Sequence, residues 1–127
     1  MAKIAVLDTS RARKVRWKNS TIQEAWAAPR LLELLEDGYT VYIASTRSQL
    51  YPEGCDKCLF DRIPSDRFFY ANPDMDTSHA HAPGLIDLWT RVLTHLDIPI
   101  PEHTDDRWER TWMDLRYIAQ EAGVIIR

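Results

Sequence analysis

The sequence predicts an α/β domain in which helices cover both faces of a mainly parallel sheet. Short apolar runs, typical of buried strands, alternate along the chain with longer segments whose apolar residues recur at helical spacing. The first apolar run ends in Asp8, and the second ends in Ser45 and Thr46. In an open parallel sheet, ligands bind outside the carboxyl ends of the strands. We therefore expect one Rossmann-like, three-layer domain over residues 1–127, with a ligand site at that edge.

The N-terminal half is expected to hold two strands with a helical segment between them. Residues 4–7 are a continuous apolar run, as in a buried strand. Residues 9–21 are polar and basic without a clear period, and are expected to form a loop. Residues 22–35 have apolar positions at helical spacing, and Pro29 is expected to split this helix because proline fits best in a first turn. Residues 41–44 are β-branched and aromatic, which favours the second strand.

The C-terminal half begins with an irregular, loop-rich segment at about 48–83. Short strands are expected in it at 58–60 and 68–70. Residues 85–96 then form a strongly amphipathic helix that Pro83 and Gly84 open. The last expected elements are an extended segment at 98–101, a helix over 108–122 and a strand at 124–126.

Composition narrows the class of protein. With 127 residues, the chain is long enough for one domain with a modest core. A net charge of −3 argues against non-specific nucleic-acid binding, which usually requires a basic surface. No apolar run reaches the roughly 18 residues of a membrane span, and no signal peptide is visible, so we expect a cytoplasmic protein. Four of the five tryptophans lie on apolar helical stripes and are expected to pack in the core.

Taken in order, these segments resemble the haloacid dehalogenase superfamily, whose members are mostly magnesium-dependent phosphatases with a Rossmann-like core. The resemblance spans nearly the whole chain. Asp8 matches the nucleophile after the first strand, and residues 29–47 match the helix, glycine and strand of the second motif. Residues 79–86 have the context of the third motif, and residues 105–126 have the shape of the fourth motif and the helix and strand after it.

The resemblance implies a magnesium-dependent phosphohydrolase acting on a small phosphorylated metabolite or nucleotide, without a cap domain. Asp8 would be the nucleophile, and it would hold Mg²⁺ together with Asp105 and Asp106, while Ser10 would supply a backbone carbonyl. The substrate phosphate would be bound by Ser45 or Thr46, with Arg47 and Lys57 as candidate cations.

Two departures from the family pattern open an alternative. Ser10 stands where the family's phosphatases carry a second aspartate as general acid and base. The lysine that pairs with nucleophile and phosphate is missing, and Ala80 falls near its place. The candidates to replace this lysine are Arg47, Lys57 and the histidines at 79 and 81. The alternative function is therefore a catalytically weak or inactive binding or interaction protein that keeps the fold.

A second set of residues predicts a structural zinc site. Cys55 and Cys58 form a Cys-x-x-Cys pair, and His79 and His81 follow. Two thiolates and two imidazoles satisfy tetrahedral zinc. Some sugar-phosphate phosphatases of the superfamily carry a zinc loop at this place, with different ligand spacing. The alternative is two reduced cysteines and two loop histidines.

The pair Asp74-x-Asp76 raises a third reading, because Toprim nucleases and topoisomerases hold magnesium with such a pair after a strand. That fold needs a glutamate after its first strand, where this chain has Asp8 followed by Thr9. An exposed acidic loop is the competing interpretation of the pair.

Overall fold

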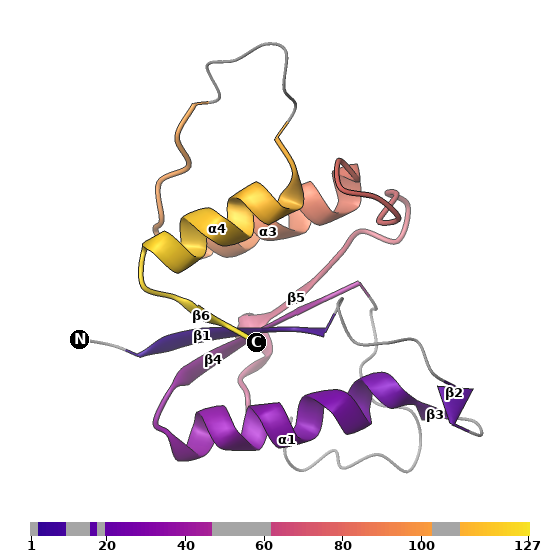
Figure 1. Cartoon of the computed structure of the whole chain (residues 1–127), viewed down its shortest axis with the longest axis vertical. Coiled ribbons are helices and arrows are strands. Elements are labelled where there is room, and N and C mark those ends of the chain that lie inside the picture. The colour runs from indigo at the N-terminus through magenta and orange to yellow at the C-terminus, as the bar shows by residue number, and fades with distance from the viewer. Residues whose placement is uncertain (1–2, 10–15, 18–19, 47–61, 103–109) are drawn as a thin grey trace.

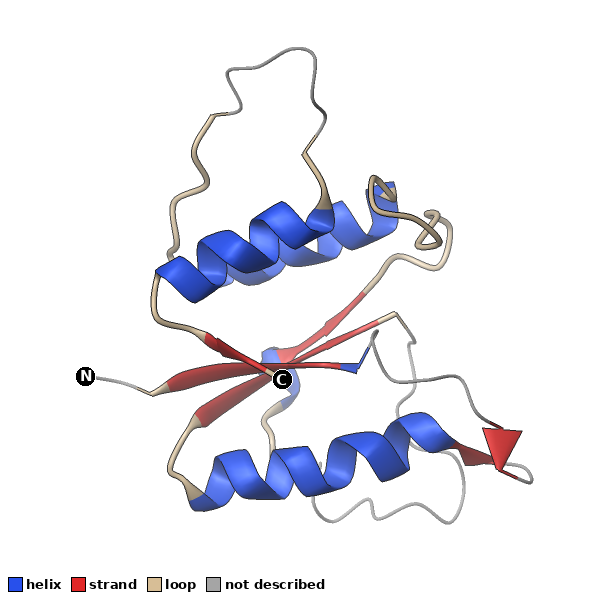
Figure 2. Cartoon of the chain, viewed as in Figure 1, coloured by secondary structure: helices blue, strands red, loops and turns tan. Residues whose placement is uncertain are grey.

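A computed structural model describes residues 3–9, 16–17, 20–46, 62–102 and 110–127, and for residues 16–17 and 20–28 it describes the backbone alone. The expected α/β class is confirmed. A parallel sheet forms the middle layer, with helix α1 on one face and helices α3 and α4 on the other (Figures 1 and 2). This layering is compatible with a Rossmann-like fold.

The sheet has four strands in the order β5-β4-β1-β6, and every neighbouring pair is parallel. The strands are β1 (Ile4–Asp8), β4 (Thr40–Ser45), β5 (Phe68–Tyr70) and β6 (Ile125–Ile126). The chain moves outward from β1 through β4 to β5 and then returns to the other side of β1 with β6. The strand order therefore reverses beside β1, which is where open α/β sheets bind ligands.

Strand β1 is buried on both faces, and its side chains alternate between the two layers. Ala5 and Leu7 belong to the core beneath α1, whereas Val6 belongs to the core beneath α3 and α4. Because successive side chains of a strand point to opposite faces, Asp8 lies on the same face as Val6. The last residue of β1 is thus directed toward the α3 and α4 layer.

Helix α1 (Ile22–Glu36) contains Pro29, and the expectation that this proline splits it is wrong. Pro29 is exposed, so its ring projects toward solvent. Its cost is mainly one missing backbone hydrogen bond and a local clash. Leu31 and Leu34 are buried against the sheet in the following turn, and their burial outweighs that cost. The helix ends at Glu36, and Gly38, two residues later, has a φ of 82° that suits a left-handed cap.

Helices α3 (Pro83–His95) and α4 (Trp112–Glu121) cover the other face. Both begin at the carboxyl edge of the sheet and run back antiparallel to its strands (Figure 1). They bury one continuous set of apolar side chains against the sheet and each other, namely Leu85, Leu88, Trp89, Val92, Leu93, Leu115 and Ala119. The amphipathic pattern of the sequence predicted this face of α3.

Two further expectations need correction. Part of the expected loop at 9–21 forms a small antiparallel pair, β2 (Arg16–Trp17) with β3 (Ser20–Thr21). Two-residue strands need no apolar period, so periodicity could not find them. Residues 98–101, expected to be extended, belong to no strand, and the fourth strand of the sheet is β6. Helix α4 begins at Trp112 rather than at 108, because Thr111 caps it. The strand expected at 58–60 lies outside the described residues, whereas the strand at 68–70 is confirmed as β5.

A single-turn 3₁₀ helix, η2 (Ser65–Arg67), leads directly into β5.

Among the described residues, no helix combines the length and the apolarity that crossing a bilayer requires.

Candidate functional site

The candidate site lies at the carboxyl end of β1, where Asp8 is the last residue of the strand. Asp8 is fully buried, with 0% of its surface exposed, and so is the following residue, Thr9. The backbone N–H of Asp8 donates to the carbonyl of Arg127 over a distance of 2.8 Å, which joins this end of β1 to the segment after β6. The carboxylate is therefore held at the point where the strand order reverses.

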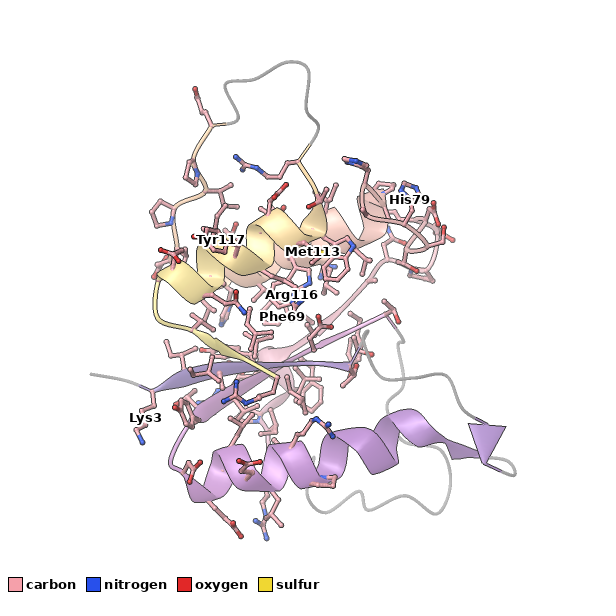
Figure 3. The ribbon with its side chains drawn as sticks, viewed as in Figure 1. Lys3, Phe69, His79, Met113, Arg116 and Tyr117 are labelled. Atoms are coloured by element: carbon pink, nitrogen blue, oxygen red, sulfur yellow. The ribbon has the colours of Figure 1, made fainter. Side chains whose placement is uncertain are left out.

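A cation lies directly against this carboxylate. Nε of Arg116 is 3.4 Å from Oδ2 of Asp8, and Arg116 itself is only 8% exposed. Arg116 belongs to α4 and lies on the side of that helix that faces the sheet (Figure 3). Two buried opposite charges at this separation attract strongly, because little water screens them.

Two tryptophans hold the Arg116 guanidinium in place. Its central carbon lies 5.7 Å from the ring centroid of Trp89, which is on α3, and 5.5 Å from that of Trp112, at the start of α4. Both distances are within the range of cation–π attraction. The backbone N–H of Trp112 also donates to the carbonyl of Ala80 over 3.2 Å, so the loop before α3 is tied to this end of α4.

Arg116 was not among the residues that the sequence analysis selected, although the sequence carries a signal for it. Trp112, Leu115 and Ala119 define the apolar stripe of the last helix. Arg116 lies four residues after Trp112 and three before Ala119, and therefore falls on that same stripe. A charged residue on a buried helical stripe needs a buried partner, and Asp8 is that partner here.

Ser45, the last residue of β4, lies on the other face of the sheet from Asp8. The parallel register places Asp8 beside Ala44, which belongs to the core under α3 and α4. The alternation along β4 puts Ser45 on the opposite face, with Ile43 and α1. Thr46 follows and is half-buried. On the β1 side, the hydroxyl of Thr9 donates to the carbonyl of Ala44 over 3.2 Å, which joins the two strand ends.

Several predicted site residues lie outside the described residues, namely Ser10, Arg47, Cys55, Lys57, Cys58, Asp105 and Asp106. Their predicted roles therefore stay predictions. In the part of the chain that the structure describes, no group of three or more histidine, cysteine, aspartate or glutamate side chains is arranged to hold a metal ion.

The two predicted histidine ligands, His79 and His81, lie in the exposed loop before α3, where Figure 3 labels His79. Nε2 of His79 is 2.9 Å from Oδ2 of Asp76, and Nδ1 of His79 accepts the backbone N–H of His81 over 3.2 Å. Both ring nitrogens of His79 are thus engaged. His79 would have to leave one of these partners to bind zinc.

The acidic pair of this loop has a structural role. The Asp76 carboxylate accepts the hydroxyl of Ser78 over 2.6 Å and its backbone N–H over 3.0 Å, and these bonds lower the pKa of Asp76. The backbone N–H of Asp74 donates to the side-chain oxygen of Asn72. Asx-type bonds of this kind fix tight turns. The Asp76 carboxylate therefore helps to fix this exposed loop, whereas Asp74 takes part in it through its backbone N–H.

The predicted magnesium site at Asp8 stays a prediction, because its other predicted ligands lie outside the described residues. Magnesium binds oxygen ligands at about 2.0–2.1 Å in a near-octahedral shell. Asp8 is the only predicted magnesium ligand among the described residues, and a guanidinium already lies 3.4 Å from its Oδ2 atom. Arg116 places a positive charge beside this carboxylate.

No family model, curated protein or solved structure matches the chain.

Proposed function

We propose that the chain is a phosphohydrolase of haloacid dehalogenase type that acts on a small phosphorylated metabolite or nucleotide. The observation that carries the proposal is Asp8 itself, a carboxylate at the end of the central strand of a parallel sheet with Arg116 beside it. This edge is where such sheets bind ligands. A carboxylate can attack phosphorus, and an adjacent guanidinium can stabilise the oxygens of the phosphoryl group.

The proposed reaction runs through two displacements at phosphorus. In the first, an Asp8 oxygen forms a bond to phosphorus while the ester P–O bond breaks, and the leaving alkoxide takes a proton from water. In the second, water attacks the aspartyl phosphate, which releases inorganic phosphate and regenerates the carboxylate. Arg116 would neutralise charge on the phosphoryl oxygens. The residue two places after Asp8 is a serine, so the departing group lacks a carboxylic acid there.

The burial of Asp8 favours a second candidate function. A carboxylate with no exposed surface cannot meet a phosphoester until the structure opens. A buried ion pair can instead serve to fix one arrangement of the fold. On this second proposal the chain is a binding or interaction protein that kept the sheet and its ligand edge, and Asp8 and Arg116 hold α4 on β1.

Phosphate release from a panel of phosphoesters distinguishes the two. Wild type, Asp8→Asn and Asp87→Asn are compared with magnesium and with a chelator. Asp87 is a matched control, because it also pairs with an arginine at 3.0 Å but lies on the exposed side of α3. The phosphohydrolase proposal predicts turnover in wild type and Asp87→Asn that Asp8→Asn abolishes.

Turnover that survives in Asp8→Asn would contradict the proposal that Asp8 is the nucleophile. If the folded wild-type protein releases no phosphate, the phosphohydrolase proposal is ruled out for the substrates of that panel. A thermal shift with the same phosphoesters would then test the binding protein, which predicts stabilisation without turnover.

A further inference from the structure

We infer that Trp89 is a further ligand-binding residue of the candidate site, and that its indole N–H donates a hydrogen bond to an oxygen of the bound phosphoryl group. The inference rests on the proposed function in taking a phosphoryl group as the occupant of the site. It gives a binding role to a tryptophan that was expected only to pack in the core.

The first argument is a buried donor that lacks a partner. Trp89 lies in α3 with 0% of its surface exposed, and among the described residues no acceptor is bonded to its Nε1 atom. Buried indole N–H groups usually have an acceptor, because bulk water cannot replace the bond once the side chain is buried. An indole N–H donates and cannot accept, so its partner must supply a lone pair. An oxygen of a ligand meets that requirement.

The second argument is the place of this side chain. The central carbon of the Arg116 guanidinium lies 5.7 Å from the centroid of the Trp89 ring, and Nε of Arg116 is 3.4 Å from Oδ2 of Asp8. Trp89 also belongs to the core cluster that contains Ala44, the residue that the sheet register places beside Asp8. The indole therefore lies in one buried cluster with the proposed nucleophile and its cation.

The chemistry of the cluster favours an oxyanion as the ligand. The guanidinium of Arg116 and the indole of Trp89 offer donors and no acceptor. When an Asp8 oxygen bonds to phosphorus in the proposed reaction, the negative charge moves from the carboxylate to the phosphoryl oxygens. Donors that are already held in place can stabilise this charge without rearrangement. A metal cation would leave the Trp89 N–H without a partner.

Nuclear magnetic resonance of the indole N–H groups tests the inference on the full chain, with inorganic phosphate as the probe. Trp89 and Asp8 have no exposed surface, so phosphate enters only when the structure opens, as the proposed function already requires. The Trp89 resonance is assigned by sequential experiments. We expect phosphate to move this proton to lower field and to slow its exchange with solvent, whereas sodium chloride of the same ionic strength should not.

Two matched variants measure what the N–H contributes to phosphate affinity. Trp89→Phe and Trp112→Phe each remove one indole beside Arg116, but only Trp89 carries the fully buried, unpartnered N–H. Trp89→Phe should weaken phosphate binding about 10-fold or more, because a hydrogen bond to a charged acceptor is lost. Trp112→Phe should weaken it only about 3-fold, through the loss of one cation–π contact.

Three results would overturn the inference. One is a Trp89 indole resonance that does not respond to bound phosphate, which is expected if the N–H is bonded to a buried water. Another is an equal loss of affinity in the two phenylalanine variants, and the third is a wild-type protein that does not bind phosphate. If Trp89→Phe does not fold, the wild-type resonance decides the question.

Failure of the proposed function is scored separately, because it is measured as phosphate release that does not depend on Asp8. A protein that releases no phosphate from esters, but whose Trp89 N–H responds to inorganic phosphate, would support the inference and favour the binding protein.

Discussion

The guanidinium of Arg116 and the carboxylate of Asp8 form a buried ion pair that joins α4 to the central strand β1. The pair stands at the edge of the sheet where its strand order reverses. Helix α4 is followed by β6, which pairs with β1. The ion pair therefore ties α4 to the strand that lies beside β6. The same contact therefore organises the fold and occupies the candidate site.

The energetic coupling of this pair can be measured directly. Breaking a buried pair by removing one partner leaves an uncompensated charge, and Arg116→Met should lower the free energy of unfolding by about 3–5 kcal/mol. Combining it with Asp8→Asn should cost less than the sum of the single changes, by roughly 1–3 kcal/mol. Urea denaturation of the four proteins gives the cycle. Strict additivity would mean that the two side chains do not interact in solution.

Gly84 allows the loop before α3 to pack against the first turn of that helix. A Cβ at this position would lie 2.7 Å from the carbonyl oxygen of Asp76 and 2.8 Å from Cγ2 of Thr77. The carbonyl also accepts the N–H of Gly84 over 2.8 Å, so the backbone cannot withdraw without losing a bond. Gly84→Ala should therefore destabilise the protein by about 1–3 kcal/mol in thermal or urea unfolding.

Gly38 provides the matched control, because a side chain is disfavoured there by the backbone conformation and not by crowding. A Cβ there meets nothing within 4 Å, but its φ of 82° disfavours side chains. Asparagine tolerates this conformation better than alanine does. Gly38→Asn should thus be milder than Gly38→Ala, whereas Gly84→Asn should be at least as harmful as Gly84→Ala. The reverse order at Gly84 would show that the crowding is relieved in solution.

The hydrogen bonds of Ser78 make the loop sensitive to acid. The Ser78 hydroxyl, followed by its backbone N–H, holds the pKa of Asp76 below its usual value of 3.8. A carboxyl with a lowered folded-state pKa contributes stability above its unfolded pKa, and that contribution is lost as the pH falls through the folded-state pKa. Ser78→Ala should raise the pKa of Asp76 toward 3.8, as followed by NMR titration of the carboxyl carbon. An unchanged titration would mean that the hydroxyl bond is not formed in water.

The two central strands of the sheet could be predicted because they are largely buried on both faces. Residues 4–7 and 41–44 are continuous apolar runs, and both became core strands of a parallel sheet. The amphipathic stripe of 85–96 likewise predicted α3, because its period matches the buried face. Local pattern was less successful at Pro29, where the burial of the next turn against the sheet overrides a helix-breaking residue.

The site was harder to predict, because its partners are far apart in the sequence. Asp8 was selected from its place after the first strand, but its partner Arg116 lies 108 residues later on a helix expected only to pack. The order of the strands was not predicted, and β6, from the end of the chain, takes the place beside β1. Sequence spacing reports neighbours along one helix or strand, whereas this ion pair depends on how a helix crosses a sheet.

The N-terminal cap of α4 should control how firmly Trp112 and Arg116 are held. Thr111 accepts the backbone N–H of Asp114 over 3.2 Å, and the Asp114 carboxylate accepts the N–H of Thr111 over 2.7 Å, which together form a capping box. Thr111→Ala removes one of these bonds and should cost about 1 kcal/mol.

The same change should loosen the first turn of α4, and should therefore alter tryptophan emission under native conditions as Trp112 separates from Arg116. Thr94→Ala, at an exposed position in the last turn of α3, is the control and should change neither quantity appreciably. A Thr111→Ala protein with wild-type stability would mean that α4 is held by its buried face and the Asp8 pair alone, independently of its cap.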